Sequence, residues 1–274
     1  MEISLSIDPK LVRKILTEFI RSEITRAGFS RAVINLSGGI DSAVSFILAV
    51  EALGPQNVLA IRLPYKTSSA DSLEHAQLLI DQTGCPSMTI PITEMIEPLI
   101  NLEPGMSEIR KGNIMARSRM IVAYDRSEVF KGLVVGTGNK TEILLGYTTL
   151  YGDSACALNP IGDLFKTQVR ELAQSLGIPE PIITKPPSAD LWIGQTDEGE
   201  LGFTYEEVDK LLHLLVDQRY RPEECVEAGF DEEFVRNVFE RVRKNQLKRV
   251  LPIIAKLSNR TVGYDFLYLR DWGT

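Results

Sequence analysis

Cysteine and histidine are scarce in this chain of 274 residues, which has three cysteines (Cys85, Cys156 and Cys225) and two histidines. An odd number of widely separated cysteines fits neither a disulfide framework nor a CxxC metal site. Apolar runs are short as well: none approaches the ~18 residues that a membrane-spanning helix needs, and the first residues lack the basic and then apolar order of a signal peptide. We therefore expect a protein of the reducing cytoplasm with no membrane-bound part.

Positive charge is also in short supply, because 30 Lys and Arg stand against 37 Asp and Glu, for a formal net charge of −7. This balance argues against a broad basic face that would neutralise many phosphates of a nucleic acid. A small anionic substrate remains compatible with it, since a local cationic pocket needs only a few side chains. The length suits one large α/β domain or two small ones, and we expect a single domain over residues 1–274.

The first half of the chain alternates short β-branched runs with longer amphipathic segments, which is typical of parallel strands joined by crossover helices. Right-handed crossovers would place the strands in one doubly wound parallel sheet flanked by helices, with ligands at the carboxyl ends of the strands. The pattern predicts strands over 32–36, 58–63, 87–91 and 133–136, and helices over 9–27, 42–52 and 69–83, with two more helical stretches between residues 93 and 130.

Beyond Gly146 the pattern changes to loops and shorter helices. The segment 186–202 is polar and contains glycine, so we interpret it as a long functional loop or lid. Two amphipathic stretches, over 205–218 and 231–247, predict C-terminal helices.

A glycine-rich turn joins the first predicted strand to the helix that follows it, so its amides lie at a helix N-terminus and attract an anion. Gly38 and Gly39 allow positive φ angles and close approach of phosphate oxygens. The Asp41 carboxylate would repel a phosphate unless a cation lay between them, which points to Mg²⁺. A tight turn in which Asp and Ser merely cap the helix is the structural alternative. The residues of this predicted phosphate-binding loop are Ser37, Gly38, Gly39, Ile40, Asp41 and Ser42.

This hexapeptide resembles the pyrophosphate-binding loop of the ATP pyrophosphatases, which share the adenine nucleotide alpha-hydrolase-like fold. The resemblance implies attack at the α-phosphate of ATP and release of pyrophosphate. The lysine of a Walker loop is absent, which disfavours transfer of the γ-phosphoryl group. The loop by itself leaves GMP synthetase, argininosuccinate synthetase, tRNA-modifying enzymes and NAD synthetase open.

Later segments resemble the NAD synthetase family: residues 111–120, 136–142, 146–153, 159–167 and 185–191. The resemblance implies an ammonia-dependent enzyme that amidates deamido-NAD with ATP through an acyl-adenylate, giving NAD, AMP and pyrophosphate. It also implies a homodimer. Catalysis is expected from charge stabilisation by Lys166 and, through the metal, Asp41, with no assigned general base. The implied ligand contacts are ATP at Arg62, Thr137, Lys166 and Ser188, Mg²⁺ at Asp41 and Glu142, and deamido-NAD at Arg117, Tyr147 and Lys248.

Several of these positions have an ordinary structural alternative. Arg117 and Arg119 are two apart on a helix, so at most one faces the cleft, and an exposed arginine in a surface ion pair is the alternative for Arg117. Glu142 near a helix start is also favoured by the helix dipole alone. Tyr147 and Tyr151 could stack on a nicotinate or adenine ring, or pack in the core.

Two positions depart from some ammonia-dependent members, which have Lys where this chain has Leu150 and His where it has Leu247. The Thr-Leu-Tyr-Gly-Asp form of 149–153 resembles the synthetase part of glutamine-dependent enzymes. The residues before the first strand are too few for a glutaminase, so ammonia is the expected donor. A separate glutaminase partner and a non-catalytic nucleotide-binding module remain the alternatives.

Overall fold

The computed structural model describes residues 3–188, 190–192, 194–250 and 252–266. None of the helices in these ranges combines the length and the apolar character needed to cross a bilayer. In chain order the elements are α1 (Pro9–Arg26), β1 (Ala32–Asn35), α2 (Ile40–Leu53), the 3-10 turn η1 (Pro55–Asn57), β2 (Val58–Arg62), α3 (Ala70–Thr83), β3 (Ser87–Thr89), α4 (Thr93–Ile100), α5 (Glu108–Phe130), β4 (Leu133–Val134), α6 (Lys140–Leu145), α7 (Lys166–Ser175), α8 (Glu180–Ile183), α9 (Asp197–Leu201), α10 (Tyr205–Leu212), the π-helical turn η2 (His213–Asp217), α11 (Pro222–Glu227), α12 (Glu232–Lys244) and the 3-10 turn η3 (Gln246–Lys248).

The four strands form one parallel sheet in the order β3-β2-β1-β4. Val33 of β1 lies beside both Leu59 of β2 and Val134 of β4, so β1 is central. The chain runs outward from β1 in both directions, and in doubly wound sheets such a reversal of strand order, here between β1 and β4, marks where ligands bind. The predicted strands are confirmed, each shorter at its carboxyl end, where the chain leaves the ladder to form a loop.

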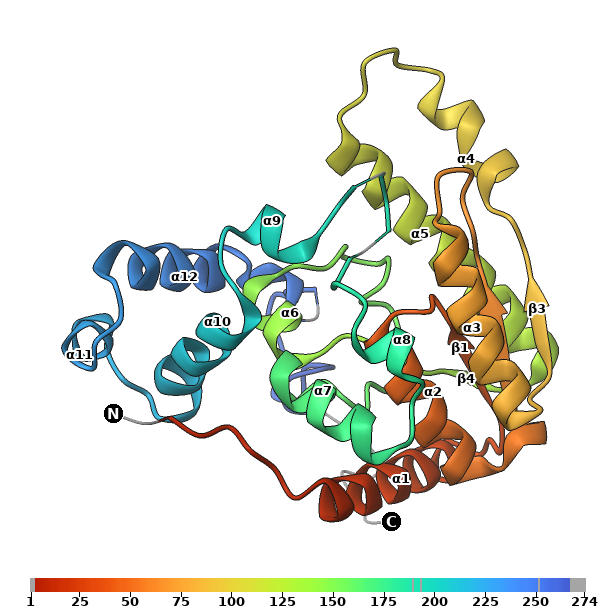
Figure 1. Ribbon diagram of the computed structural model, residues 1–274, viewed down its shortest axis with the longest axis horizontal. Coiled ribbons are helices and arrows are strands. Elements are labelled where there is room, and N and C mark those ends of the chain that lie inside the picture. The colour runs from red at the N-terminus through yellow and green to blue at the C-terminus, as the bar shows by residue number, and fades with distance from the viewer. Residues whose placement is uncertain (1–2, 189, 193, 251, 267–274) are drawn as a thin grey trace.

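Both faces of the sheet are covered by helices, as a doubly wound sheet requires (Figure 1). Ile34 and its neighbours on one face pack into a core shared with α1, α2, α3 and α7. Val33 and Ile61 on the other face pack against Ile96 of α4 and Met115 of α5. Because both faces are buried, β1 and β2 are apolar along nearly their whole length rather than alternating with polar residues.

A third core lies among the C-terminal helices, on the left in Figure 1, with α6 and α7 between it and the sheet. Val208 and Leu211 of α10 pack there with Val238 of α12, Leu145 of α6 and Phe165. Each such fully buried side chain contributes about 1.5–3 kcal/mol. The segments around α6 and α7 therefore touch both halves of the molecule.

The structure differs from the predicted second half at three places. The segment 186–202 contains a helix, α9, because the Thr196 side chain accepts a hydrogen bond from Gly199 N and caps its start. The stretch 205–218 changes from α-helix to a π-helical turn at His213. The last predicted helix ends at Lys244, after which residues 246–248 form a tighter 3-10 turn.

Candidate active site

The loop between β1 and α2 is held in shape by its own hydrogen bonds. The hydroxyls of Ser37 and Ser42 lie 3.0 Å apart, the Gly39 amide donates to Ser37 Oγ over 3.3 Å, and Ser42 donates to the Gly39 carbonyl over 2.9 Å. Gly38 has a φ of +81°, and a Cβ there would lie 2.1 Å from the carbonyl oxygen of Ser72. Only glycine fits at this position, so the loop is a preformed backbone cradle.

Helix α2 begins where this loop ends. Its first residue, Ile40, has a side chain that is 6% exposed and packs in the core, which leaves only the backbone to face a ligand. The free amides of the first turn and the positive end of the helix dipole favour an anion here. Asp41, one residue later, is the single acidic residue of that first turn.

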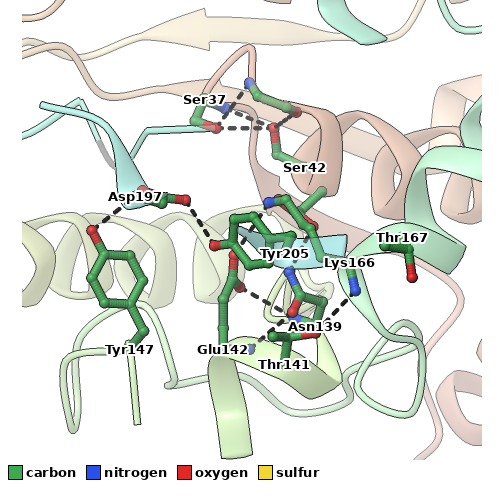
Figure 2. Close-up of polar contacts among 12 residues, drawn as sticks. Ser37, Ser42, Asn139, Thr141, Glu142, Tyr147, Lys166, Thr167, Asp197 and Tyr205 are labelled. Carbon is green, nitrogen blue, oxygen red and sulfur yellow. Dashed lines mark hydrogen bonds and ion pairs between the residues drawn. The ribbon is translucent and has the colours of Figure 1, made fainter. Parts of the chain in front are cut away.

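Two carboxylates from different elements meet one lysine beside this loop. Lys166 Nζ forms ion pairs with Asp41 and, over 3.3 Å, with Glu142 Oε1, and Lys166 is only 2% exposed. Asn139 donates its side-chain amide to Asp41 Oδ1 over 2.9 Å. Figure 2 shows Asn139, Glu142 and Lys166 grouped in this way. The structure thus brings together three of the residues that the sequence singled out, although it places the lysine between the carboxylates.

Glu142 also performs the structural task that the sequence left open. Its carboxylate accepts from Asn139 N over 3.2 Å, and its own amide donates to Asn139 Oδ1 over 3.0 Å, so the pair forms a capping box at the start of α6. This pattern of Asn and Glu three residues apart is a recognisable sequence signal. It could have identified Asn139, which the sequence analysis missed.

Burial and the neighbouring Asp41 raise the pKa of Glu142 to about 8, in spite of Lys166. Burial disfavours the charged amine of Lys166, but Asp41 and Glu142 outweigh it and raise the pKa of Lys166 above its ordinary value. Lys166 therefore stays cationic, and Glu142 is the member of the cluster that takes up a proton near neutral pH. A further cation would compete with that proton.

The donors fit a magnesium ion that arrives with a polyphosphate. Within the described ranges, His, Cys, Asp and Glu side chains nowhere gather in threes around a common point that could hold a metal. Mg²⁺ in nucleotide sites is bound through one or two carboxylates together with phosphate oxygens and water. Asp41 and Glu142 supply two such carboxylates, and the repulsion between them is what a divalent cation relieves.

Residues of α9 and α10 cover this cluster, and the sequence analysis missed them. Tyr205 donates to Asp197 Oδ2 over 3.0 Å, and the Lys166 Nζ lies 5.2 Å from the centre of the Tyr205 ring. Tyr147 donates to Asp197 Oδ1 over 3.3 Å and also to Glu200, as its orientation toward Asp197 in Figure 2 shows. Burial, followed by nearby carboxylates, raises the pKa of both tyrosines, so they remain donors. Tyr147 thus holds α9 in place.

The other predicted ATP residues lie at the same edge of the sheet with varied partners. Thr137 is half-buried in the loop that follows β4. Arg62 ends β2, and its Nη1 donates over 2.5 Å to Gln77 of α3. The Ser188 hydroxyl accepts from Asp190 N over 3.1 Å, and the Asp190 carboxylate accepts from the amide that precedes α3.

Arg117 and Arg119 point to different sides of α5, as their spacing predicts. Arg117 is exposed and donates through Nε to the Leu150 carbonyl over 3.2 Å. Arg119 is half-buried and donates through Nε to the Leu63 carbonyl, just beyond β2, over 3.1 Å. Burial lowers the pKa of Arg119 below its usual value, although nearby carboxylates oppose this.

Lys248 contacts the backbone rather than the carboxylate cluster. Its Nζ donates to the carbonyls of Gly146 and Thr148 over 2.6 and 2.8 Å, and burial lowers its pKa. Leu247 beside it is 65% exposed. Arg117 and Lys248 therefore both hold the segment 146–150, and the structure does not bring them together with Asp41.

Comparisons with known proteins agree over nearly the whole chain. The family model described as NAD synthase matches residues 12–252. The NH(3)-dependent NAD(+) synthetase of Trichlorobacter lovleyi is 54% identical over 269 residues, which cover 98% of each chain. The solved NMN synthetase of Francisella tularensis is similar with a TM-score of 0.82 at 31% identity, covering 92% of this chain and 100% of that one. The NH3-dependent NAD synthetase of Campylobacter jejuni is similar with a TM-score of 0.78 at 32% identity, covering 91% of this chain and 100% of that one.

Proposed function

The chain belongs to the NAD synthase family, and from that membership we propose that it forms NAD by the ATP-dependent amidation of deamido-NAD with ammonia. It is a ligase that makes a carbon–nitrogen bond and releases AMP and pyrophosphate. The observation that carries this assignment is the convergence of Asp41, Glu142 and Lys166 beside the loop 37–42, at the N-terminus of α2. Such a site suits a polyphosphate that is split between its α- and β-phosphates.

The reaction has two steps, and the chain contributes charge stabilisation to the first. The nicotinate carboxylate attacks the α-phosphorus of ATP, the bond to the β-phosphate oxygen breaks, and pyrophosphate leaves. Lys166, kept cationic by its two carboxylates, compensates the negative charge that grows on the leaving group. Ammonia then attacks the acyl carbon, the bond to the AMP oxygen breaks, and the surplus proton passes to solvent.

We propose Asp41 and Glu142 as the residues that hold Mg²⁺. Their support is the hard oxygen donor set and the raised pKa of Glu142, which burial and then the neighbouring Asp41 cause. When bound, the ion supplies a Lewis acid that neutralises phosphate charge. The chain's own part is to keep the two carboxylates beside Lys166, through Asn139 and the start of α6.

For the ATP contacts we propose the loop residues 37–42 with Arg62, Thr137, Lys166 and Ser188. Their support is a shared location, since all follow or flank the carboxyl ends of β1, β2 and β4. We propose Arg117, Tyr147 and Lys248 for deamido-NAD. The support is that Arg117 and Lys248 are two cationic side chains that contact the backbone of the segment 146–150, away from the loop 37–42.

One assay tests the function. Purified protein with ATP, Mg²⁺, deamido-NAD and ammonium should give NAD, AMP and pyrophosphate in equal amounts, and no NAD with glutamine in place of ammonium. Nicotinate mononucleotide is the matched competing substrate, because one similar structure is an NMN synthetase. Formation of ADP and phosphate, or of no product from either substrate, would refute the assignment. The relative that is named as NH(3)-dependent aligns over 98% of both chains. This similarity disfavours the two alternative functions, a synthetase subunit supplied by a separate glutaminase and a non-catalytic nucleotide-binding module.

We further propose a homodimer. Its support on this chain is a set of exposed apolar side chains on α5, where Ile121, Tyr124 and Val129 are 55%, 42% and 65% exposed. Sedimentation at micromolar concentration should give twice the chain mass of 30.6 kDa, and a monomer would refute it.

Two further parts of the proposal concern organisation and place. We propose that residues 1–274 act as a single catalytic domain, supported by the alignment with relatives of the same length. We propose a reducing cytoplasm, supported by Cys85, Cys156 and Cys225, which are all free thiols. Loss of ammonia-dependent activity under mild oxidation would support a reducing cytoplasm. Finding the protein in an oxidising compartment with its thiols unchanged would contradict it.

A further inference from the structure

Asp209 of α10 is a buried carboxylate that the reaction as described does not use. It is 0% exposed. Among the residues that the structure describes, its hydrogen-bond partners are uncharged: Thr141 Oγ1 donates to Oδ1 over 2.5 Å, and Thr167 N donates to Oδ2 over 2.9 Å. Burial raises the pKa of Asp209. Burial of a carboxylate without a cationic partner lowers the free energy of unfolding, so a compensating role for Asp209 is expected.

The two donors flank the residues that form the ion-pair cluster. Thr141 immediately precedes Glu142, and Thr167 immediately follows Lys166. The Thr141 hydroxyl also accepts a hydrogen bond from Lys166 N over 3.0 Å. Asp209 therefore closes a ring of hydrogen bonds that joins the first turn of α6 to the first turn of α7.

The direction of each bond in this ring is determined by the groups themselves. The Lys166 amide can only donate, so the single proton of the Thr141 hydroxyl points to Asp209. Helix α7 begins after Phe165, whose side chain cannot accept a hydrogen bond, so one unpaired amide of its first turn needs an acceptor from elsewhere. Asp209 supplies acceptors to both donors, which no neutral side chain of the same shape can do.

Helix α10 also has apolar contacts that do not involve this carboxylate. Val208, Leu211 and Leu212 are each 0% exposed and pack in the C-terminal core. We propose that Asp209 is a positioning residue: it holds the backbone at Thr141 and Thr167 so that the side chains of Glu142 and Lys166 converge with Asp41. This inference rests on the proposed function, because it assigns the cluster to the adenylation of deamido-NAD.

Asp209→Asn is the sharpest variant. An NH₂ group that faces Thr167 meets the donor of that amide. An NH₂ group that faces Thr141 makes the hydroxyl accept a second hydrogen bond and leaves the hydroxyl proton without its acceptor, so either orientation breaks one bond of the ring. A displaced catalytic group lowers kcat more than ground-state binding, and we expect kcat to fall roughly ten- to a hundredfold with the KM for deamido-NAD within about threefold. Val208→Ala is the matched control: it removes buried atoms one residue away and lowers the melting temperature without touching the ring.

Variants of Thr141, which lies between Asp209 and the Lys166 amide in the ring, give an independent test. This test remains available if Asp209→Asn fails to fold. Thr141→Val removes the hydroxyl and should lower kcat as Asp209→Asn does, whereas Thr141→Ser keeps it and should retain kcat within about threefold. The double variant of Asp209→Asn and Thr141→Val should be no worse than the poorer single variant.

Equal kcat for Asp209→Asn and Val208→Ala, or full activity of Thr141→Val, would overturn the positioning role. Absence of NAD formation by the unaltered protein would instead overturn the proposed function, so the two failures are separate. Melting temperatures of all variants accompany the kinetics, and a kcat loss that only tracks the melting temperature counts against the proposal.

Discussion

The carboxylate cluster at 41, 142 and 166 and the residues proposed for deamido-NAD, at 117, 147 and 248, differ in how they are held. The first group has a buried lysine and two partly buried carboxylates, comes from three elements and converges on one point. The second group is spread out, and its polar atoms contact backbone carbonyls or the acids of α9. The chain thus builds the proposed phosphate-activating end of the site from converging side chains, and the end proposed for the dinucleotide mainly by holding the segment 146–150.

Lys166→Met should have the largest effect and tests whether the cluster is the phosphate-activating end of the site. It leaves Asp41 and Glu142 without their common cation, and we expect NAD formation to fall roughly a hundred- to a thousandfold. Lys140→Met is the matched control, since Lys140 also forms two ion pairs, with Asp163 and Asp217, outside the cluster. Steady-state rates at saturating substrates measure this. If the rate of NAD formation by Lys166→Met is within threefold of the parent rate, the cluster is not the essential part of the site, and the contrast between the two regions is wrong.

Gly38→Ala should come next, because its Cβ collides with the Ser72 carbonyl and its φ is +81°. We expect the KM for ATP to rise about tenfold or more and the free energy of unfolding to fall by about 1–3 kcal/mol. Gly177→Ala is the control, since Gly177 has a φ of +68° and open space around it. If only the KM for deamido-NAD rises, the loop 37–42 contacts the dinucleotide rather than ATP, and the prediction is wrong.

Arg117→Ala should affect only the dinucleotide side. Loss of one charged hydrogen-bond donor predicts a rise of about tenfold in the KM for deamido-NAD, with the KM for ATP unchanged. Arg126→Ala, on the same helix and paired with its neighbour Asp125, is the control. If the KM for ATP changes instead, Arg117 belongs with the carboxylate cluster.

The last prediction, which leaves the chemistry at saturating Mg²⁺ unchanged, concerns the pH dependence of the melting temperature. The pKa of Glu142 in the folded chain is about 8, above its unfolded value, so its stabilising contribution is full below the unfolded pKa and is lost as the pH rises through 8. Without Mg²⁺, the melting temperature of the parent should fall over this range relative to that of Glu142→Gln. Added Mg²⁺ should restore the parent at pH above 8, and parallel curves without metal would contradict the shift.

The strands and the glycine-containing turn between β1 and α2 could be predicted because their signals are local. The apolar run that forms β1 is followed by Ser37, Gly38 and Gly39, and the run that forms β2 is followed by Pro64. The position of Lys166 could not be predicted in this way, since it meets Asp41 across 125 residues of sequence. Asp197 and Asp209 look like ordinary acids of exposed helical turns until the fold buries them. The ligand roles proposed for the site residues stay predictions.

The contact of Asp209 with Thr141 and Thr167 has a consequence for the order in which the protein is made. During synthesis the sheet and the phosphate-binding loop leave the ribosome well before α10. A nascent chain can therefore fold its nucleotide-facing surface while α6 and α7 still lack the carboxylate that aligns them. With the positioning role proposed for Asp209, the cluster at 41, 142 and 166 is therefore aligned only after the later part of the chain has been made.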